Sequence, residues 1–364
     1  MKRNTLRTSA SAAALLSLAL VLGACGAGNE DGGSDSGSGT LSGTLNGAGA
    51  SSQQAVVAAW KSAFQTENSD ATVNYDPVGS GGGREQFISG GVDFAGSDAY
   101  LDDEELAAAQ DRCGGEIIEV PVYVSPIAVV FNLEGVDSLN MSSQTIGAIF
   151  EGTITSWDDP AIVADNPEAT LPSAPIIPVH RSDDSGTTKN FTAYLEETSG
   201  GSWSAGEVET WPTPEGESAQ GTAGVIDRVK ATANSITYAD ASQAGGLSTV
   251  AVKVGDTFTE YSPEAAAAIL EKSAPVEGRG ETDLAIAVDR ATEESGVYPV
   301  VLVSYAIACQ NYEDAEKADL VKGWLSYLVS SEGQETAAAD AGAAPIGGDI
   351  ADKAKSAVET ISAS

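Results

Sequence analysis

Apolar residues follow strand-like and helix-like patterns in turn along the chain after residue 40. Residues 41–50 (LSGTLNGAGA) predict a short strand that ends in a glycine turn. Residues 51–65 carry their apolar side chains at helical spacing, and Ser51 or Ser52 is the expected N-cap of that helix. The first predicted unit is therefore a strand followed by an amphipathic helix.

The same alternation continues to the C-terminal end of the chain. Further strands are expected within residues 71–80, 92–100, 116–133, 174–182, 235–245 and 297–309, and helices within 84–91, 102–113, 142–152, 185–198 and 318–342. The Gly/Pro-rich stretch 200–221 predicts an irregular surface connection. Strands alternating with helices, with polar loops after the strands, predict an α/β fold with a largely parallel sheet.

Two β-rich runs, residues 116–133 and 297–308, are longer than the other predicted strands. If the chain forms two lobes, these runs are the natural strands to cross between them. Cys113 lies just before the first run and Cys309 just after the second. Antiparallel pairing of the two runs would bring both thiols together.

The composition limits the classes of partner. The chain has 364 residues, is 42% hydrophobic and carries a formal net charge of -35. This length suits about two domains, and the apolar content allows a buried core. So acidic a surface argues against nucleic-acid binding, which requires a basic face. Any bound anion must be held by local dipoles and a few cations against the overall field.

The N-terminal residues indicate export. Residues 1–24 combine Lys2, Arg3 and Arg7 with an apolar run too short to remain as a membrane span, which is typical of a signal peptide. Residues 22–25 (LGAC) resemble the lipobox of bacterial lipoproteins, in which the cysteine, here Cys25, is acylated. An ordinary signal peptide with an incidental cysteine is the alternative. Residues 25–39 then predict a flexible Gly/Ser/Asp tether.

Export also bears on the two remaining cysteines. An oxidising compartment permits a disulfide, so we expect Cys113 and Cys309 to pair. Two free buried thiols are the alternative.

Three segments share a design that suits an anion. Residues 47–56 (GAGASSQQAV), 78–87 (VGSGGGREQF) and 183–191 (DDSGTTKNF) each lead into a helix through Gly, Ser or Thr. Free N–H groups and the helix dipole favour negative charge at such ends, and glycine permits close approach. Ordinary capped helices are the alternative for each segment alone. None of the three is a Walker A loop, and residue 47 does not begin a full dinucleotide-binding motif.

Charged residues near these segments sharpen the anion hypothesis. Arg181 offers a planar fork suited to a tetrahedral oxyanion, and Asp183 could hold that fork in place. Asp98 looks misplaced in an anion site unless the ligand carries a proton to donate. Phosphate carries one near neutral pH and sulfate does not, so one carboxylate can separate them. The alternative for Asp98 is an N-cap of the helix at 102–113.

Several segments together resemble the phosphate-binding protein of the bacterial high-affinity phosphate ABC transporter. They are GAGASS, VGSGGG, VDFAGSDAYL, IFEGTITSWDDPAI, IIPVHRSDDSGTT, ETWPTPEG, GTAGVIDRVKA, SITYADAS and YPVVLVSYAI, in order between residues 42 and 345. The resemblance implies a type II periplasmic-binding-protein fold, with two α/β lobes joined by a two-strand hinge. Residues 40–121 and 303–364 would form lobe I, and residues 122–302 lobe II.

The resemblance also implies a site, a location and partners. A dehydrated phosphate would lie in the interlobe cleft, and the closed form would deliver it to the permease and ATPase subunits of the importer. The protein would be anchored through lipid on Cys25 at the extracytoplasmic face of the bacterial membrane. Family members often have Thr-Phe where this chain has Ser51-Ser52, which leaves local packing there open. The family's phosphate ligands fall on Ser51, Ser52, Ser80, Asp98, Arg181, Ser185, Gly186 and Thr187, with Asp183 in support.

Three other functions remain possible from the residues. One is a receptor for sulfate or another oxyanion. Asp98 discriminates between this function and phosphate binding, because its carboxylate can accept a proton from phosphate but not from sulfate. A secreted phosphatase would need a metal or an activated nucleophile, but the one histidine, His180, has no metal-ligand cluster around it in the sequence. A purely structural lipoprotein would have no need of three anion-suited helix starts. We expect no enzyme activity, no cofactor and no metal.

Overall fold

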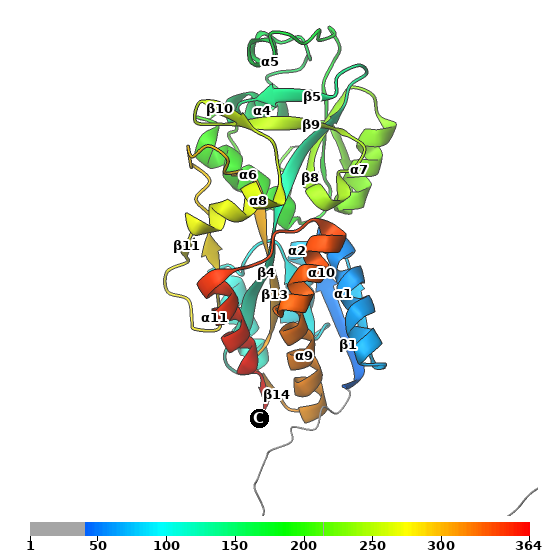
Figure 1. The fold of residues 1–364 in the computed structure, drawn as a ribbon, viewed down its shortest axis with the longest axis vertical. Helices are drawn as coiled ribbons and strands as arrows, with labels where there is room; N and C mark the ends of the chain where they lie inside the picture. The colour runs from blue at the N-terminus through cyan, green and yellow to red at the C-terminus, as the bar shows by residue number, and fades with distance from the viewer. Residues whose placement is uncertain (1–40, 214) are drawn as a thin grey trace, which may run out of the picture. The chain divides into compact units, whose positions relative to one another are not determined.

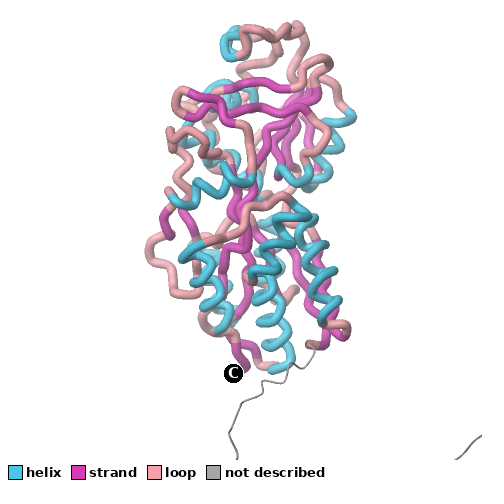
Figure 2. The backbone as a smooth tube through the Cα atoms, viewed as in Figure 1, coloured by secondary structure: helices cyan, strands magenta, loops and turns pink. Residues whose placement is uncertain are grey.

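The structure, a computed structural model, describes residues 41–213 and 215–364. The predicted signal peptide, Cys25 and the tether lie outside the described residues. Figure 1 shows helices packed on a sheet whose long strand β4 passes through the middle of the molecule from one half into the other, and Figure 2 shows the same path by secondary structure. Among the described residues, no helix has the length and apolarity needed to cross a membrane.

The first part of the fold alternates parallel strands with helices, as predicted. β1 (Ser42–Gly49) pairs in parallel with both β2 (Asp70–Asp76) and β3 (Phe94–Ser97). The helices between and after these strands are α1 (Gln54–Glu67), α2 (Ser80–Ile88) and α3 (Asp103–Cys113). The helical spacing in the sequence is confirmed by α1, which buries Val56, Val57, Trp60 and Phe64.

Two long strands form the centre of the sheet. β4 (Ile117–Asn132) and β13 (Val301–Cys309) pair antiparallel, and β13 also lies antiparallel to β3. The sheet is therefore mixed, and the expectation of a largely parallel sheet holds for its flanks alone. The reason is that β4 leads the chain out of the first half of the molecule and β13 returns it.

The predicted disulfide is present. Cys309 lies opposite Ile117 in the β4–β13 ladder, and Cys113 ends α3 just before β4. Their Cα atoms are 5.4 Å apart and their sulfurs are bonded. The antiparallel pairing of the two long runs thus brings together thiols separated by 196 positions.

The second part of the fold lies at the far end of β4. The sheet there follows the order β4-β8-β6-β7, with β9 also paired to β4 and to β5 and β10. Its strands are β5 (Ser138–Met141), β6 (Ile177–Arg181), β7 (Glu217–Ala219), β8 (Ser235–Asp240), β9 (Ser248–Val254) and β10 (Thr257–Thr259). Its helices are α4 (Ser143–Phe150), α5 (Pro160–Asp165), α6 (Gly186–Thr198) and α7 (Gly221–Ala231).

The last third of the chain returns to the first half of the molecule. Figure 1 shows α10 and α9 next to α1, with α11 on the other side of α9, all in the half of the molecule opposite α5. The elements concerned are α8 (Pro263–Ala267), β11 (Ala274–Pro275), β12 (Ile286–Ala287), α9 (Ala315–Leu328), β14 (Asn311–Tyr312), α10 (Ser331–Ala341), α11 (Gly348–Glu359) and β15 (Ser362–Ala363). The hydrophobic patterns predicted α9 and α10 and missed α5, α7, α8 and α11.

One segment of predicted lobe II associates with the first half of the molecule. The Glu119 N–H of β4 donates to the carbonyl of Thr282, and the Leu284 N–H donates to the carbonyl of Glu119. The Thr282 hydroxyl also donates to the carbonyl of Ile117. Residues 282–284 therefore lie along the part of β4 assigned to lobe I. The exact lobe limits stay a prediction.

Candidate anion-binding site

The glycine run after β2, residues 79–83, allows close backbone packing and is not a linker. Gly79 is the N-cap of α2 with φ +101°, and the next three glycines lie inside the helix. A Cβ at Gly83 would fall 2.3 Å from the Cα of Gly49, so α2 packs directly on the end of β1. A Cβ at Gly79 would fall 2.5 Å from the carbonyl oxygen of Asp184. The run therefore lets two backbones meet closely at the start of α2.

Asp98 lies at the centre of the candidate site. It follows β3 and is 2% exposed. Its Oδ1 accepts from the Ser304 hydroxyl at 2.7 Å, and its Oδ2 accepts from the Ser52 hydroxyl at 2.5 Å. Its backbone N–H donates to Ser80 Oγ at 3.1 Å. Burial raises the pKa of Asp98, although these hydroxyls and the charge of Arg181 oppose that rise.

The helix-cap alternative for Asp98 is excluded. The N-cap of α3 is Asp102, whose side chain accepts from the Glu105 N–H at 2.8 Å. The Glu105 side chain accepts in return from the Asp102 N–H, which completes a capping box. Asp98 is therefore free to serve the site.

Arg181 ends β6 and is 3% exposed. Its Nε donates to Asp183 Oδ1 at 2.7 Å and its Nη2 donates to Asp183 Oδ2, so the predicted support of the fork is present. Burial raises the pKa of Asp183, but the hydrogen bonds and charge of Arg181 outweigh it and hold the pKa below the ordinary value. Asp183 Oδ1 also accepts from the Gly221 N–H at 3.0 Å. Nη1 of Arg181 takes no part in this bidentate pair.

The start of α6 adds donors opposite Asp98. Ser185 is the N-cap, and its Oγ accepts from the Thr188 N–H at 3.1 Å. The Thr187 hydroxyl donates to Asp98 Oδ2 at 3.3 Å. A Cβ at Gly186 would fall 2.4 Å from Ser80 Oγ, so Gly186 is needed for this close approach. The first N–H groups of a helix have no partner within the helix, so the start of α6 has the general character of an anion-binding end.

The two serines before α1 do not cap it, contrary to the sequence expectation. The N-cap is Gln53, and it makes no side-chain cap hydrogen bond. Ser51 Oγ instead accepts from the Thr222 N–H at 3.0 Å, and Ser52 bonds Asp98. The hydroxyls turn toward partners far along the chain, which outcompete the local cap.

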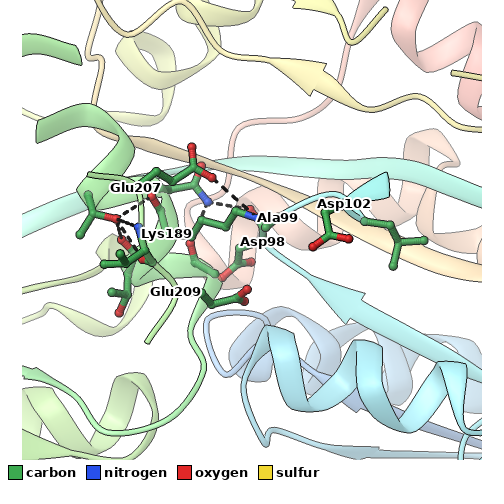
Figure 3. A network of polar contacts seen from close by, with 12 residues as sticks. Asp98, Ala99, Asp102, Lys189, Glu207 and Glu209 are labelled. Atoms are coloured by element: carbon green, nitrogen blue, oxygen red, sulfur yellow. Dashed lines mark hydrogen bonds and ion pairs between the residues drawn. The ribbon is translucent and has the colours of Figure 1, made fainter. Parts of the chain in front are cut away.

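Contacts across the site join the two halves of the molecule. Arg84 of α2 donates to both carboxylate oxygens of Glu209, at 3.2 and 2.6 Å. Asn190 Nδ2 donates to the Asp98 carbonyl at 2.6 Å. Figure 3 shows Asp98 and Ala99 facing Lys189, Glu207 and Glu209, with Asp102 farther along the loop. These contacts hold the two halves of the molecule together around the site, which we call the closed arrangement.

His180 has a structural environment. Its ring stacks on Trp211 with centroids 4.9 Å apart, and Nδ1 lies 3.0 Å from the Arg181 carbonyl. Burial lowers the pKa of His180. The buried ring contacts the Trp211 side chain and backbone, which agrees with the structural interpretation.

The structure brings together every predicted site residue among the described ones. Their roles as phosphate ligands stay a prediction. Sequence reasoning missed four neighbours: Gln53, Asn190, Thr222 and Ser304. All four lie within segments already singled out, but nothing in the sequence pattern shows that their side chains reach the site.

A second buried carboxylate near the site gives a pH-dependent stability. Burial raises the pKa of Asp240 from 3.8 to about 6, and its Oδ2 has no hydrogen-bond partner among the described residues. Between these values the folded state binds more protons than the unfolded state, so stability falls as pH rises. We expect this group to lower the free energy of unfolding by about 2 kcal/mol from pH 4 to pH 7.

The measurement is urea unfolding of the wild type and Asp240→Asn across that pH range. The variant should lose this part of the pH dependence and gain relative stability at pH 7. Asp256→Asn, at an exposed turn residue, is the matched control and should follow the wild type. Equal pH dependence in Asp240→Asn and the wild type would contradict the prediction.

The fold and site define a class, the two-lobed binding proteins of the periplasmic type. The chain matches the PBP superfamily domain over residues 34–332. Among solved structures, the high affinity periplasmic phosphate-binding protein PfluDING gives a TM-score of 0.70 at 21% identity, covering 86% of this chain and 93% of that chain. The phosphate binding protein from Stenotrophomonas maltophilia gives 0.66 at 20% identity, covering 86% and 94%. Both likenesses concern the fold.

Curated relatives narrow the class to a family. Phosphate-binding protein PstS 3 of Mycobacterium leprae is 36% identical over 309 residues, 82% of each chain. Phosphate-binding protein PstS 3 of Mycobacterium tuberculosis is 34% identical over 377 residues, 99% of this chain and 100% of that protein. The chain belongs to the PstS phosphate-binding protein family. Membership implies a binding role and no catalytic one.

Proposed function

We propose that this protein binds inorganic phosphate between its two halves and delivers it to an ABC importer. The observation that carries the proposal is Asp98, a buried carboxylate among hydroxyl and N–H donors beside Arg181. A fully ionised anion would face this carboxylate with unpaired like charge, whereas phosphate presents a proton to it. Permease and ATPase subunits are the partners that this role requires.

The closed arrangement supplies the mechanism. Ser52, Ser80 and Asp98 come from the first half of the molecule, whereas Arg181 and the start of α6 come from the second. A ligand that contacts both sets is bound fully in the closed state alone, so it shifts the open–closed equilibrium toward closure. The Arg84–Glu209 pair bridges the same two halves and favours the same state.

Titration calorimetry on a form lacking residues 1–39 tests the proposal. Phosphate should bind with a Kd of about 1 μM or lower, because charge-assisted hydrogen bonds contribute about 1.5–3 kcal/mol each. Sulfate should give no binding heat. Asp98→Asn should gain sulfate binding or weaken phosphate binding, because an amide can donate where the carboxylate cannot.

Asp102→Asn is the matched control for this experiment. Asp102 is an exposed helix cap four residues away, and asparagine caps equally well. This variant should bind phosphate as the wild type does. Equal binding of phosphate and sulfate by the wild type would remove the chemical basis of the proposal.

We propose, in addition, that Cys25 carries a lipid that holds the protein at the outer face of the cell membrane. The support is the lipobox-like LGAC and the tether after it. Acyl chains on one residue can anchor a folded domain stably when at least two are present. Metabolic labelling with a palmitate analogue should mark the wild type and leave Cys25→Ala unlabelled.

A further inference from the structure

The two carboxylate oxygens of Asp98 have different kinds of neighbours. Oδ1 accepts from Ser304 Oγ of β13 at 2.7 Å. Oδ2 accepts from two hydroxyls, those of Ser52 at 2.5 Å and Thr187 at 3.3 Å. The two oxygens are therefore held from different elements.

The direction of the Ser304 hydrogen bond is fixed by Gln53. Gln53 Nε2 lies 3.1 Å from the Tyr305 carbonyl oxygen and 2.9 Å from Ser304 Oγ. A backbone carbonyl only accepts, so the amide nitrogen, and not its oxygen, must face Tyr305. The second amide hydrogen then goes to Ser304 Oγ. Because Gln53 Nε2 is a donor, Ser304 cannot give its single proton to Gln53, and that proton goes to the carboxylate oxygen Oδ1 of Asp98.

The surroundings of Gln53 hold this orientation in place. Gln53 is 3% exposed and Ser304 is fully buried. A Cβ at Gly96 would fall 2.2 Å from Gln53 Oε1, so a glycine of β3 leaves the room that the amide fills. The Tyr75 hydroxyl lies 3.4 Å from the same Oε1. That hydroxyl is also 3.0 Å from the Ala50 carbonyl, so its proton is shared between two acceptors, and the amide is held chiefly through its nitrogen.

The neighbours of Oδ2 impose no such direction. Ser52 and Thr187 are hydroxyls that can each donate or accept. Both now donate to Oδ2, but each can rotate and donate to a bound ligand instead, which leaves Oδ2 open to the ligand's proton, whereas Ser304 stays directed at Oδ1.

We propose that Gln53 and Ser304 are positioning residues that reserve Oδ1 of Asp98 as a permanent acceptor, leaving Oδ2 to take the ligand's proton. This inference rests on the proposed function, because it names the atom through which the site discriminates protonated from fully ionised oxyanions. Neither Gln53 nor Ser304 needs to touch the ligand. They act by fixing where on Asp98 a proton can reside.

Other titratable groups also face Asp98 and must be held constant. They are Arg181 from β6, Asp240 from β8, Tyr75 from β2 and Tyr123 from β4. Variants that keep all four allow a change in the pKa of Asp98 to be assigned to the Gln53–Ser304–Asp98 hydrogen-bond chain, called the relay below.

The test follows the Asp98 carboxyl directly by carbon NMR in the ligand-free protein, form 40–364, over a pH titration. Ser304→Ala removes a donor to the charged carboxylate and should raise the pKa of Asp98 by about one to two. Gln53→Met keeps the volume but frees the Ser304 hydroxyl to rotate, so a smaller rise in the Asp98 pKa is expected. Ser235→Ala, at a fully buried serine of β8 bonded to other carbonyls, is the control and should leave this pKa unchanged.

Calorimetry with phosphate and sulfate completes the test. Ser304→Ala should lose part of the preference for phosphate over sulfate, about tenfold or more for a pKa rise of one or more, while Ser235→Ala keeps it. An Asp98 pKa unchanged in both Ser304→Ala and Gln53→Met overturns the relay, even if phosphate binds normally. Absence of phosphate binding by the wild type rejects the proposed function and, with it, the ligand-proton role of Oδ2.

Discussion

Replacing Arg181 by alanine should lower the affinity for phosphate by about 100-fold to 10,000-fold. The change removes Nη1, whose two N–H groups Asp183 leaves for the ligand, and with it up to two charge-assisted hydrogen bonds of about 1.5–3 kcal/mol each. It also leaves the Asp183 carboxylate, 9% exposed, without its cation beside an anionic ligand. Calorimetry with phosphate is the measurement.

Two companion variants separate charge from geometry. Arg181→Lys keeps the cation and loses the planar fork, so its affinity should lie between those of the wild type and the alanine variant. Arg228→Ala removes the same charge from an arginine whose side chain is 50% exposed on α7, and should change phosphate affinity little. A loss of less than about threefold in Arg181→Ala would mean that this arginine does not contact the ligand.

Loss of the disulfide should be the largest single change in stability. Opening the Cys113–Cys309 bond releases a loop of 196 positions in the unfolded chain. The chain-entropy relation gives about 5 kcal/mol for a loop of this length, and measured losses of native disulfides run to about 2–5 kcal/mol. Urea unfolding should give the double variant Cys113→Ser/Cys309→Ser a free energy of unfolding about 2–5 kcal/mol below that of the wild type.

The reductant control distinguishes the bond from the side chains. Reducing agent should destabilise the wild type and have no further effect on the double serine variant. If the wild type unfolds at the same urea concentration with and without reductant, the bond contributes nothing to stability. The bond also ties the end of α3 to the end of β13, where the chain has returned from the second half of the molecule.

The closed arrangement explains why an acidic protein can still hold an anion. The chain has a formal net charge of -35, so the long-range field opposes an approaching anion. Inside the site, Arg181 is paired with Asp183, and its remaining donor acts at short range in a buried environment. Local hydrogen bonds therefore have to supply selectivity as well as affinity, which gives the relay behind Asp98 its importance.

Local patterns in the sequence determined much of the architecture. The spacing of apolar residues identified α1, because burial on one helical face repeats with the helical period. The two long apolar runs and the cysteines at their ends predicted the β4–β13 ladder and its disulfide. The segment around Arg181 and Ser185 identified a strand end and a helix start with donors for an anion. Each of these is a property of neighbouring residues.

Tertiary structure alone decided which partners the polar side chains use. Ser51 lies next to a helix start yet bonds Thr222, 171 positions away. Gln53 bonds Ser304, 251 positions away, and so sets the direction of a hydrogen bond to Asp98. Periodicity records which face of an element is buried, but a hydroxyl or amide on a buried face pairs with whatever the opposing element brings to within 3 Å or so. The α/β fold could therefore be predicted from the sequence, whereas the hydrogen-bond partners of Asp98 depended on how β13, α1 and α6 pack around it.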